Sequence, residues 1–307
     1  MKLLEELIAV QGTSGDEAKI RDFIIDYVNK DSANWKVKPE LHFGDEFQDA
    51  LILTFGNPRT AIFAHTDTIG FTVGYNNNLI KVGGPRIIDG TQLVGHDKHG
   101  DIETELMVVD HEDDSREVKC VSERVFERGT PLSFKPNYRE TEEYVQSPYL
   151  DNRLGVWVAL EVAKTLENGA IVFSTYEEHG GNSVGFLGRY LQEKYGIRQA
   201  LISDITWVTD GVKHGQGVAI SLRDKGIPRR SYINRILKIA SASNIKYQLE
   251  VESSGGSDGT MLQSSDLSFD WCFIGAAEDN VHTPDEKVHK EDIQSMIDLY
   301  VALMQRL

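Results

Sequence analysis

Hydrophobic positions in the first part of the chain alternate between helical spacing and short continuous runs. Residues 1–10 and 20–28 place apolar side chains at helical intervals, which predicts two amphipathic helices. Two apolar runs follow, at residues 51–55 and 61–64, and a Gly-Asn-Pro sequence at 56–58 separates them. This pattern predicts a strand, a turn and a second strand.

Between residues 71 and 143 the pattern changes to many short β-like pieces that are separated by glycine turns. No convincing amphipathic helix interrupts them, so we expect a small all-β module. We interpret His96 and His99 as exposed loop histidines and the acidic run at 110–114 as a solvated turn. After Pro148, strand-like runs alternate with helical stretches. The elements expected there cover residues 154–166, 170–173, 184–191, 200–205, 218–221, 233–239, 247–251, 271–274 and 292–307.

This alternation predicts an α/β fold whose sheet is covered by helices on both faces. The β module is then an insertion within the α/β domain. We therefore expect three segments: residues 1–70 as the first part of the α/β domain, 71–145 as the inserted β domain, and 146–307 as the second part.

Composition narrows the possible partners and the compartment. A net charge of −16 argues against nucleic acid or an anionic membrane as the main partner. Two cysteines, Cys120 and Cys272, form neither a disulfide framework nor a thiolate metal site. Residues 1–10 are interrupted by acids, unlike a signal peptide, and no run approaches the ~18 apolar residues of a membrane span. We expect a cytoplasmic protein.

Polar residues that can do chemistry follow the predicted strands. The stretch 170–173 is separated by only three residues from Glu177 and Glu178, and other strand-like runs end at His65 and Asp204. The candidate residues at these and neighbouring positions are His65, Asp67, Asp151, Glu177, Glu178, Asp204 and His282. Ligand sites of open α/β sheets gather at the carboxyl ends of the strands, so we expect these residues to meet at one edge.

Each candidate also has a purely structural alternative. Asp151 precedes a helical run and suits an N-cap, His65 suits a buried core histidine, and His282 suits a surface loop. Glu177 and Glu178 alone suit a solvated acidic turn. Together, however, so many carboxylates at one edge require cations, and histidine with carboxylate suits zinc, cobalt or manganese better than calcium or magnesium.

The ordered set His65-x-Asp67, Asp151, Glu177-Glu178, Asp204 and His282 resembles the co-catalytic dizinc exopeptidases. The interval between Asp67 and Asp151 accommodates an inserted module, whereas that between Asp204 and His282 is too short for the lid domain of the carboxypeptidase and deacylase branch. This arrangement resembles the tetrahedral aminopeptidases, the glutamyl aminopeptidase group of metallopeptidase family forty-two, whose members are sometimes labelled endoglucanase. Local matches agree, including the sequences around Gly83-Gly84 and Gly255-Gly256-Ser257-Asp258.

The resemblance implies a mixed sheet of the dizinc exopeptidase type and a metal-dependent aminopeptidase acting on short peptides. By the same resemblance Asp151 bridges two divalent ions, zinc first, with cobalt or manganese as alternatives. His65 and Asp204 then complete the coordination of one ion, and Glu178 and His282 complete that of the other. The resemblance further implies that Glu177 is the general base and that Asp67 orients His65.

The resemblance also implies a cis bond between Asp151 and Asn152 and a homo-oligomer formed through the inserted β domain. Three positions depart from the family pattern: Asn152, His179 and the pair Asn182-Ser183. They leave the ligands intact.

Other functions remain open from the residues alone. A deacylase or another amidohydrolase would use the same two metal ions, and a non-catalytic binding protein would share the fold. The preference for an N-terminal residue is also open. Lys213, His214 and Arg223 are candidate contacts for an acidic side chain, and an ordinary surface position is the favoured interpretation of all three.

Overall fold

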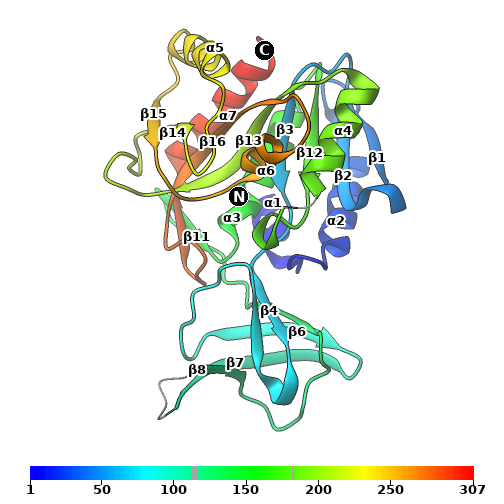
Figure 1. The fold of residues 1–307 in the computed structure, drawn as a ribbon, viewed down its shortest axis with the longest axis vertical. Helices are drawn as coiled ribbons and strands as arrows, with labels where there is room; N and C mark the ends of the chain where they lie inside the picture. The colour runs from blue at the N-terminus through cyan, green and yellow to red at the C-terminus, as the bar shows by residue number, and fades with distance from the viewer. Residues whose placement is uncertain (112–115, 182) are drawn as a thin grey trace.

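A large mixed sheet organises the chain (Figure 1). The computed structural model describes residues 1–111, 116–181 and 183–307, and in these residues eleven strands join this sheet. The strands are β1 Glu40–Gly44, β2 Gln48–Phe55, β3 Ala61–His65, β10 Arg139–Glu140, β11 Tyr144–Ser147, β12 Gly169–Ser174, β13 Gln199–Trp207, β14 Val218–Arg223, β15 Tyr247–Val251, β16 Asp270–Asp279 and β17 Glu286–His289. Their order is β1-β2-β12-β3-β13-β16-β17-β11-β10, and β14 joins β15 to β16.

The central strands β12, β3, β13 and β16 run parallel, and antiparallel pairs surround them. The predicted strands β2 and β3 both form, but they are not neighbours, because β12 lies between them. A parallel centre places the carboxyl ends of several strands at one edge.

Helices cover both faces of this sheet, as expected. They are α1 Lys2–Ala9, α2 Ala18–Asp31, α3 Leu150–Ala163, α4 Ser183–Tyr195, α5 Arg230–Ser241, α6 Asp258–Ser264 and α7 Lys290–Met304. Alternate residues of β12 show the two faces: Ile171 and Phe173 pack in the core with α1, α2, α3, α5 and α7, whereas Ala170 and Val172 pack with α4 and α6. The predicted α/β fold is confirmed.

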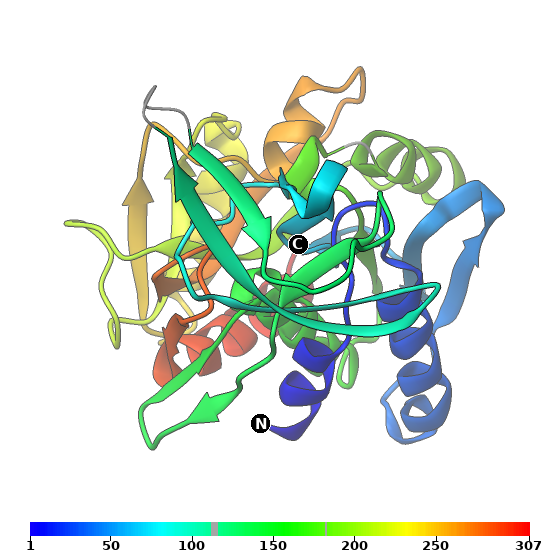
Figure 2. The same ribbon diagram turned by 90° about the horizontal axis from the view of Figure 1, so that it is seen from below.

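A second sheet of six strands has its own hydrophobic core. Its strands are β4 Gly70–Val73, β5 Leu79–Val82, β6 Gln92–Asp97, β7 Gly100–Asp110, β8 Arg116–Cys120 and β9 Pro131–Phe134, in the order β5-β4-β9-β6-β7-β8. Figure 1 shows this sheet beneath the α/β body, and Figure 2 views it from that side. Among the described residues between 71 and 143 there is no α-helix, in agreement with the predicted β module.

The proposed boundaries of this module stay a prediction. The strand β10 falls before the expected boundary at 145, yet it pairs with β11 in the large sheet. His96 is exposed, as expected, but it lies in β6 and not in a loop, and it pairs with Asp101. His99 is exposed in the turn that follows, as predicted. Asp110 of the acidic run ends β7 and is not in a turn, and residues 112–114 of the run lie outside the described residues.

One predicted strand is too short. The sequence predicts a strand over residues 271–274, but β16 spans Asp270–Asp279. Its small residues serve close packing, since a Cβ atom on Gly275 would lie 2.4 Å from the carbonyl oxygen of Asp204 in the paired strand. Glycine and alanine here mark strand contact and not a turn.

Across the described parts of the chain, no helix combines the length and apolar character that crossing a bilayer requires.

Candidate metal centre

The predicted site residues meet at the carboxyl edge of the central strands. His65 ends β3, Asp204 lies in β13, and Glu177 opens a short 3-10 turn directly after β12. Because these three strands run parallel, their ends lie together. Asp151 comes from the first turn of α3, and His282 follows β16.

Asp151 lies between two groups of potential ligands. Its Oδ1 is 3.2 Å from His65 Nε2, and that nitrogen is 3.7 Å from Asp204 Oδ2. Its Oδ2 is 3.2 Å from His282 Nε2, which is 3.3 Å from Glu178 Oε2. The ligand atoms within each group lie within 4.8 Å of one another, a spacing that could hold an ion. We call these five residues the metal group.

Asp67 connects this group to the turn that carries the two glutamates. Its Oδ1 lies 3.4 Å from His65 Nδ1 and accepts a hydrogen bond from the Glu177 N–H at 3.0 Å. Its Oδ2 accepts bonds from the Glu178 N–H and the Ser14 hydroxyl, at 3.0 and 2.6 Å. One fully buried carboxylate therefore fixes both the histidine ring and the adjacent turn.

Glu286 of β17 has a similar position on the other side, and the sequence analysis missed it. Its Oε2 accepts a hydrogen bond from the Asp151 N–H at 3.1 Å, and its Oε1 accepts one from the His282 N–H at 3.0 Å. The side chain is fully buried. An acid after Pro284 and Asp285 gives no sequence signal that separates it from a surface residue.

The structural alternative for Asp151 is not observed. Tyr149 occupies the N-cap of α3, no side chain caps the helix, and Asp151 itself has non-helical angles. The peptide bond between Asp151 and Asn152 is cis, as predicted. Asn152 anchors this segment, because its amide donates to the Ser203 carbonyl at 2.8 Å and its Oδ1 accepts from the Gly155 N–H.

Burial and crowding shift the acid–base equilibria of the group. Burial raises the pKa of Glu177 well above its ordinary value, against an opposing effect of His65. Burial, together with the charge of Asp151, raises the pKa of Glu178 to about 7. Burial lowers the pKa of His282, but its hydrogen bonds with Asp151 and Glu178 outweigh this and raise that pKa to about 11. The carboxylates therefore need positive charge nearby.

The residues present suit bound cations. Glu178 Oε1 is buried and has no hydrogen-bond partner in the described residues. Two histidines and three carboxylates form a donor set that zinc, cobalt and manganese accept.

A cavity of about 360 Å³ opens beside the metal group. Its lining includes Glu177, the 3-10 turn, Gly84 from the loop after β5, and the 254–257 segment that leads into α6. The glycine-rich segment that matches the family pattern therefore borders the cavity.

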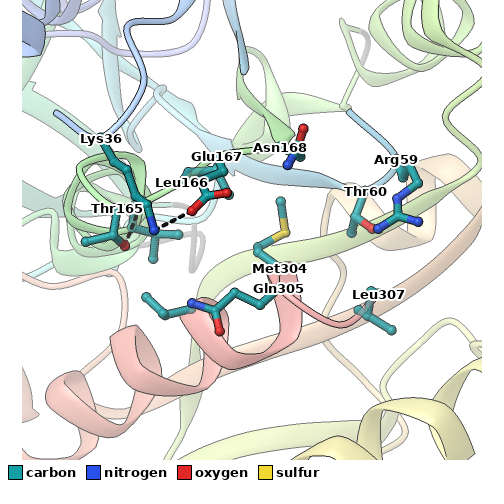
Figure 3. A pocket seen from close by; sticks show the side chains of 12 residues that line it. Lys36, Arg59, Thr60, Thr165, Leu166, Glu167, Asn168, Met304, Gln305 and Leu307 are labelled. Atoms are coloured by element: carbon teal, nitrogen blue, oxygen red, sulfur yellow. Dashed lines mark hydrogen bonds and ion pairs between the residues drawn. The ribbon is translucent and has the colours of Figure 1, made fainter. Parts of the chain in front are cut away.

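A second cavity of about 360 Å³ lies at the amino-terminal ends of the central strands (Figure 3). It is lined by residues that precede β3 and β12, among them Arg59, Thr60 and Asn168, and by Met304 of α7. Lys36 and Glu167 form an ion pair there. None of the predicted site residues lines it, so size alone does not identify the candidate site.

Comparison with known proteins agrees with this geometry. Residues 90–299 match the family model described as M42 glutamyl aminopeptidase. The chain belongs to this family. It is accordingly a peptidase, a hydrolase with aminopeptidase activity, and the resemblance found in the sequence is confirmed.

Relatives of the M42 chain span its whole length. A lysyl aminopeptidase of Pyrococcus furiosus is 24% identical over 348 aligned residues, which cover 100% of this chain and 97% of the relative. An aminopeptidase from the archaeon Desulfurococcus kamchatkensis has a TM-score of 0.86 at 19% identity, covering 100% and 94% of the two chains. The Pyrococcus horikoshii TET1 peptidase, which can assemble into a tetrahedron or a large octahedral shell, has a TM-score of 0.83 at 22% identity, covering 100% and 99%.

Two of the residues that depart from the M42 pattern make hydrogen bonds near the metal group. His179 Nδ1 accepts a hydrogen bond from the Gly83 N–H at 3.3 Å, which joins the glutamate turn to the segment after β5. Ser183 Oγ accepts from the Thr175 N–H at 2.8 Å. Asn182 lies outside the described residues.

Proposed function

We propose that this M42 chain removes N-terminal residues from short peptides with the help of two divalent metal ions. His65, Asp204 and Asp151 would hold one ion, and Glu178, His282 and Asp151 the other. The observation that carries this proposal is the position of Asp151, whose two oxygens each lie 3.2 Å from a different histidine.

Two such ions, when bound, would lower the pKa of a water molecule and stabilise the charge that develops during amide hydrolysis. Zinc is the first candidate, and cobalt and manganese suit the same ligands. Metal dependence itself follows from family membership.

Within this proposal Glu177 is the general base. It lines the cavity beside both groups, and its backbone is held by Asp67. From this position its carboxylate would take a proton from the attacking water and deliver that proton to the leaving amine nitrogen. Asp67 would act by positioning His65 and the turn, without touching the substrate.

The deciding experiment uses free and N-acetylated short peptides with protein that has been stripped of metal and reloaded with zinc, cobalt or manganese. Cleavage of free peptides only, restored by metal, supports the proposal. Cleavage of blocked peptides would point to a deacylase, and silence on both with two metals bound would point to a binding protein.

A Glu177→Gln variant tests the general base. Turnover should fall about 10²- to 10⁴-fold, because the proton acceptor is lost, while the metal content stays near that of the wild type. Wild-type activity in this variant would refute the assignment.

We also propose a homo-oligomer formed through the β module. The assembly of the P. horikoshii relative supports it. So do exposed apolar side chains on and near the second sheet, including Ile80, Met107 and Val121. Light scattering during gel filtration would test this, and replacing Ile80 by a charged residue should lower the assembly size.

A further inference from the structure

The cavity has a second group of acids beyond the metal group. Asp224 follows β14, and Glu250 and Glu252 lie in and after β15. Because β14 and β15 run parallel, their carboxyl ends lie side by side, and the Glu252 N–H donates to the Arg223 carbonyl at 2.9 Å. All three residues line the cavity, and we call them the acidic wall.

Two of the three acids in the acidic wall are buried, and the wall lacks a cationic partner in the described residues. Asp224 is 7% exposed and Glu250 is 4% exposed. Asp224 Oδ1 accepts a bond from the Gly226 N–H, and Glu250 Oε1 accepts one from the Thr206 hydroxyl. Within the described residues, Asp224 Oδ2 accepts no hydrogen bond, and none of the three acids forms an ion pair. Buried carboxylates without a compensating positive charge are costly, so this wall is suited to a cationic ligand.

Burial raises the pKa of Asp224 to about 6, and the charge of Glu250 adds to this rise against the opposing Gly226 N–H. A bound cation would relieve this cost.

The spacing of the wall favours an organic cation over a metal ion. The groups of described residues with three potential ligand atoms within 4.8 Å are the two that share Asp151, and the acidic wall is not among them. An ammonium or guanidinium group, with three to five donors, can bridge acceptors that are farther apart.

The remaining lining suits the aliphatic stem of a basic side chain. Trp207, Met261 and Phe273 border the same cavity, and Trp207 is 41% exposed. Lysine and arginine pack their methylene chains on such surfaces while the charged end reaches polar groups. Thr206, which contacts Glu250, is two positions from Asp204 of the metal group, so the wall adjoins the proposed reaction centre.

The candidates for binding an acidic substrate side chain lie elsewhere. Lys213, His214 and Arg223 do not line the cavity, and His214 Nε2 instead pairs with Asp279 at 3.0 Å. Among the described lining residues there is no lysine or arginine. A substrate glutamate would therefore meet like charge at the wall.

We infer that the acidic wall is the subsite for the first side chain of the substrate and selects peptides with an N-terminal lysine or arginine. This inference rests on the proposed aminopeptidase function and names its substrate class. The family includes proteins called glutamyl and lysyl aminopeptidase, so membership alone does not decide the preference.

The test uses the metal-loaded full chain and tripeptides X-Ala-Ala, where X is lysine, arginine, norleucine, glutamine or glutamate. Norleucine has the stem of lysine without its charge, so the ratio of kcat/KM for lysine over norleucine isolates the wall. We expect a ratio of at least about 10, with glutamate the poorest substrate. Asp224→Asn and the half-buried Glu252→Gln should each lower the ratio several-fold. Asp26→Asn, a matched change at an exposed residue of α2, should leave it unchanged.

A lysine-to-norleucine ratio near one, or a preference for glutamate, would overturn the inference while leaving the aminopeptidase proposal intact. A second measurement works without turnover: calorimetric binding of L-lysine amide and L-norleucine amide to metal-loaded Glu177→Gln. Tighter binding of the lysine compound supports the inference, and equal or absent binding of both overturns it. If no peptide is cleaved under any metal, the proposed function fails, and the calorimetry alone decides on the wall.

Discussion

Two groups of carboxylates border one cavity, and they differ in what surrounds them. In the metal group, histidines alternate with acids, and Asp151 lies 3.2 Å from each of two imidazole rings. In the acidic wall, Asp224 and Glu250 are equally buried, but their polar contacts are a backbone N–H and a hydroxyl. The two groups are therefore similarly buried, but the metal group contains histidines and the acidic wall does not.

This difference shows how one residue type can serve two kinds of cation. Closely spaced acids with histidines offer a small, fixed set of acceptors, which a metal ion requires. Acids that are spread along a wall with aromatic and thioether neighbours offer a longer surface, which a substrate side chain can span. The spacing of the acids and the residues around them, and not their charge alone, distinguish metal binding from the binding of a substrate side chain.

The largest expected effect comes from removing the residue common to both proposed ions. Asp151→Asn keeps the shape but loses the charge and one acceptor oxygen, so activity should fall by at least about 10³-fold. Metal content, measured by plasma mass spectrometry, should fall below two ions per chain. The matched change in the acidic wall, Glu252→Gln, should leave the metal content unaltered. If Asp151→Asn bound two ions at wild-type affinity, the assignment of metal binding to the metal group alone would be wrong.

The metal group was accessible from sequence because its members follow recognisable elements. His65 and Asp204 terminate or lie within apolar runs whose burial pattern is unambiguous, and parallel strands bring such positions together. The resemblance then implied the role of each residue. The fold was predictable for the same reason, since alternating strands and helices leave few arrangements.

Other parts gave no local signal. Glu286 looks like a surface acid in sequence, and its burial depends on β17 pairing with β11 and β16. The acidic wall is similar. Glu250 alternates with the apolar residues Leu249 and Val251, so the sequence pattern alone would place those two in the core and the acid toward solvent. In the structure Leu249 and Val251 are exposed and Glu250 is buried. Only the tertiary arrangement, in which β14 and β15 border the cavity, buries it.

An intermediate loss of metal affinity is expected when Glu286, which holds the backbone of two metal-group residues, is altered. Glu286→Gln replaces one acceptor oxygen by an amide group that faces a backbone N–H, so it should disturb Asp151 or His282. Metal affinity, measured by competition with a chelating dye, should weaken about 10- to 100-fold.

Glu278→Gln is the control for that experiment. Glu278 is also buried, but neither of its oxygens has a hydrogen-bond partner in the described residues. Its replacement should leave metal affinity unchanged. Equal losses in the two variants would mean that burial of charge near the group, and not the bonds made by Glu286, controls affinity.

The smallest expected effect is on the free energy of unfolding, and it tests how the pH dependence of stability reflects the uncompensated charge of the acidic wall. The pKa of Asp224 is raised from 3.8 to about 6, so its carboxyl is protonated in both folded and unfolded chains below about pH 3. As the pH rises to about 6, the unfolded chain releases its proton first, and the folded state loses stability. Asp224→Asn should therefore raise the free energy of unfolding by about 1–3 kcal/mol near pH 8 and by almost nothing near pH 3. Urea unfolding at both pH values measures this, with Asp26→Asn as the control. Destabilisation near pH 8 would show that the folded chain already compensates the Asp224 charge, and the acidic wall would then differ less from the metal group than its contacts indicate.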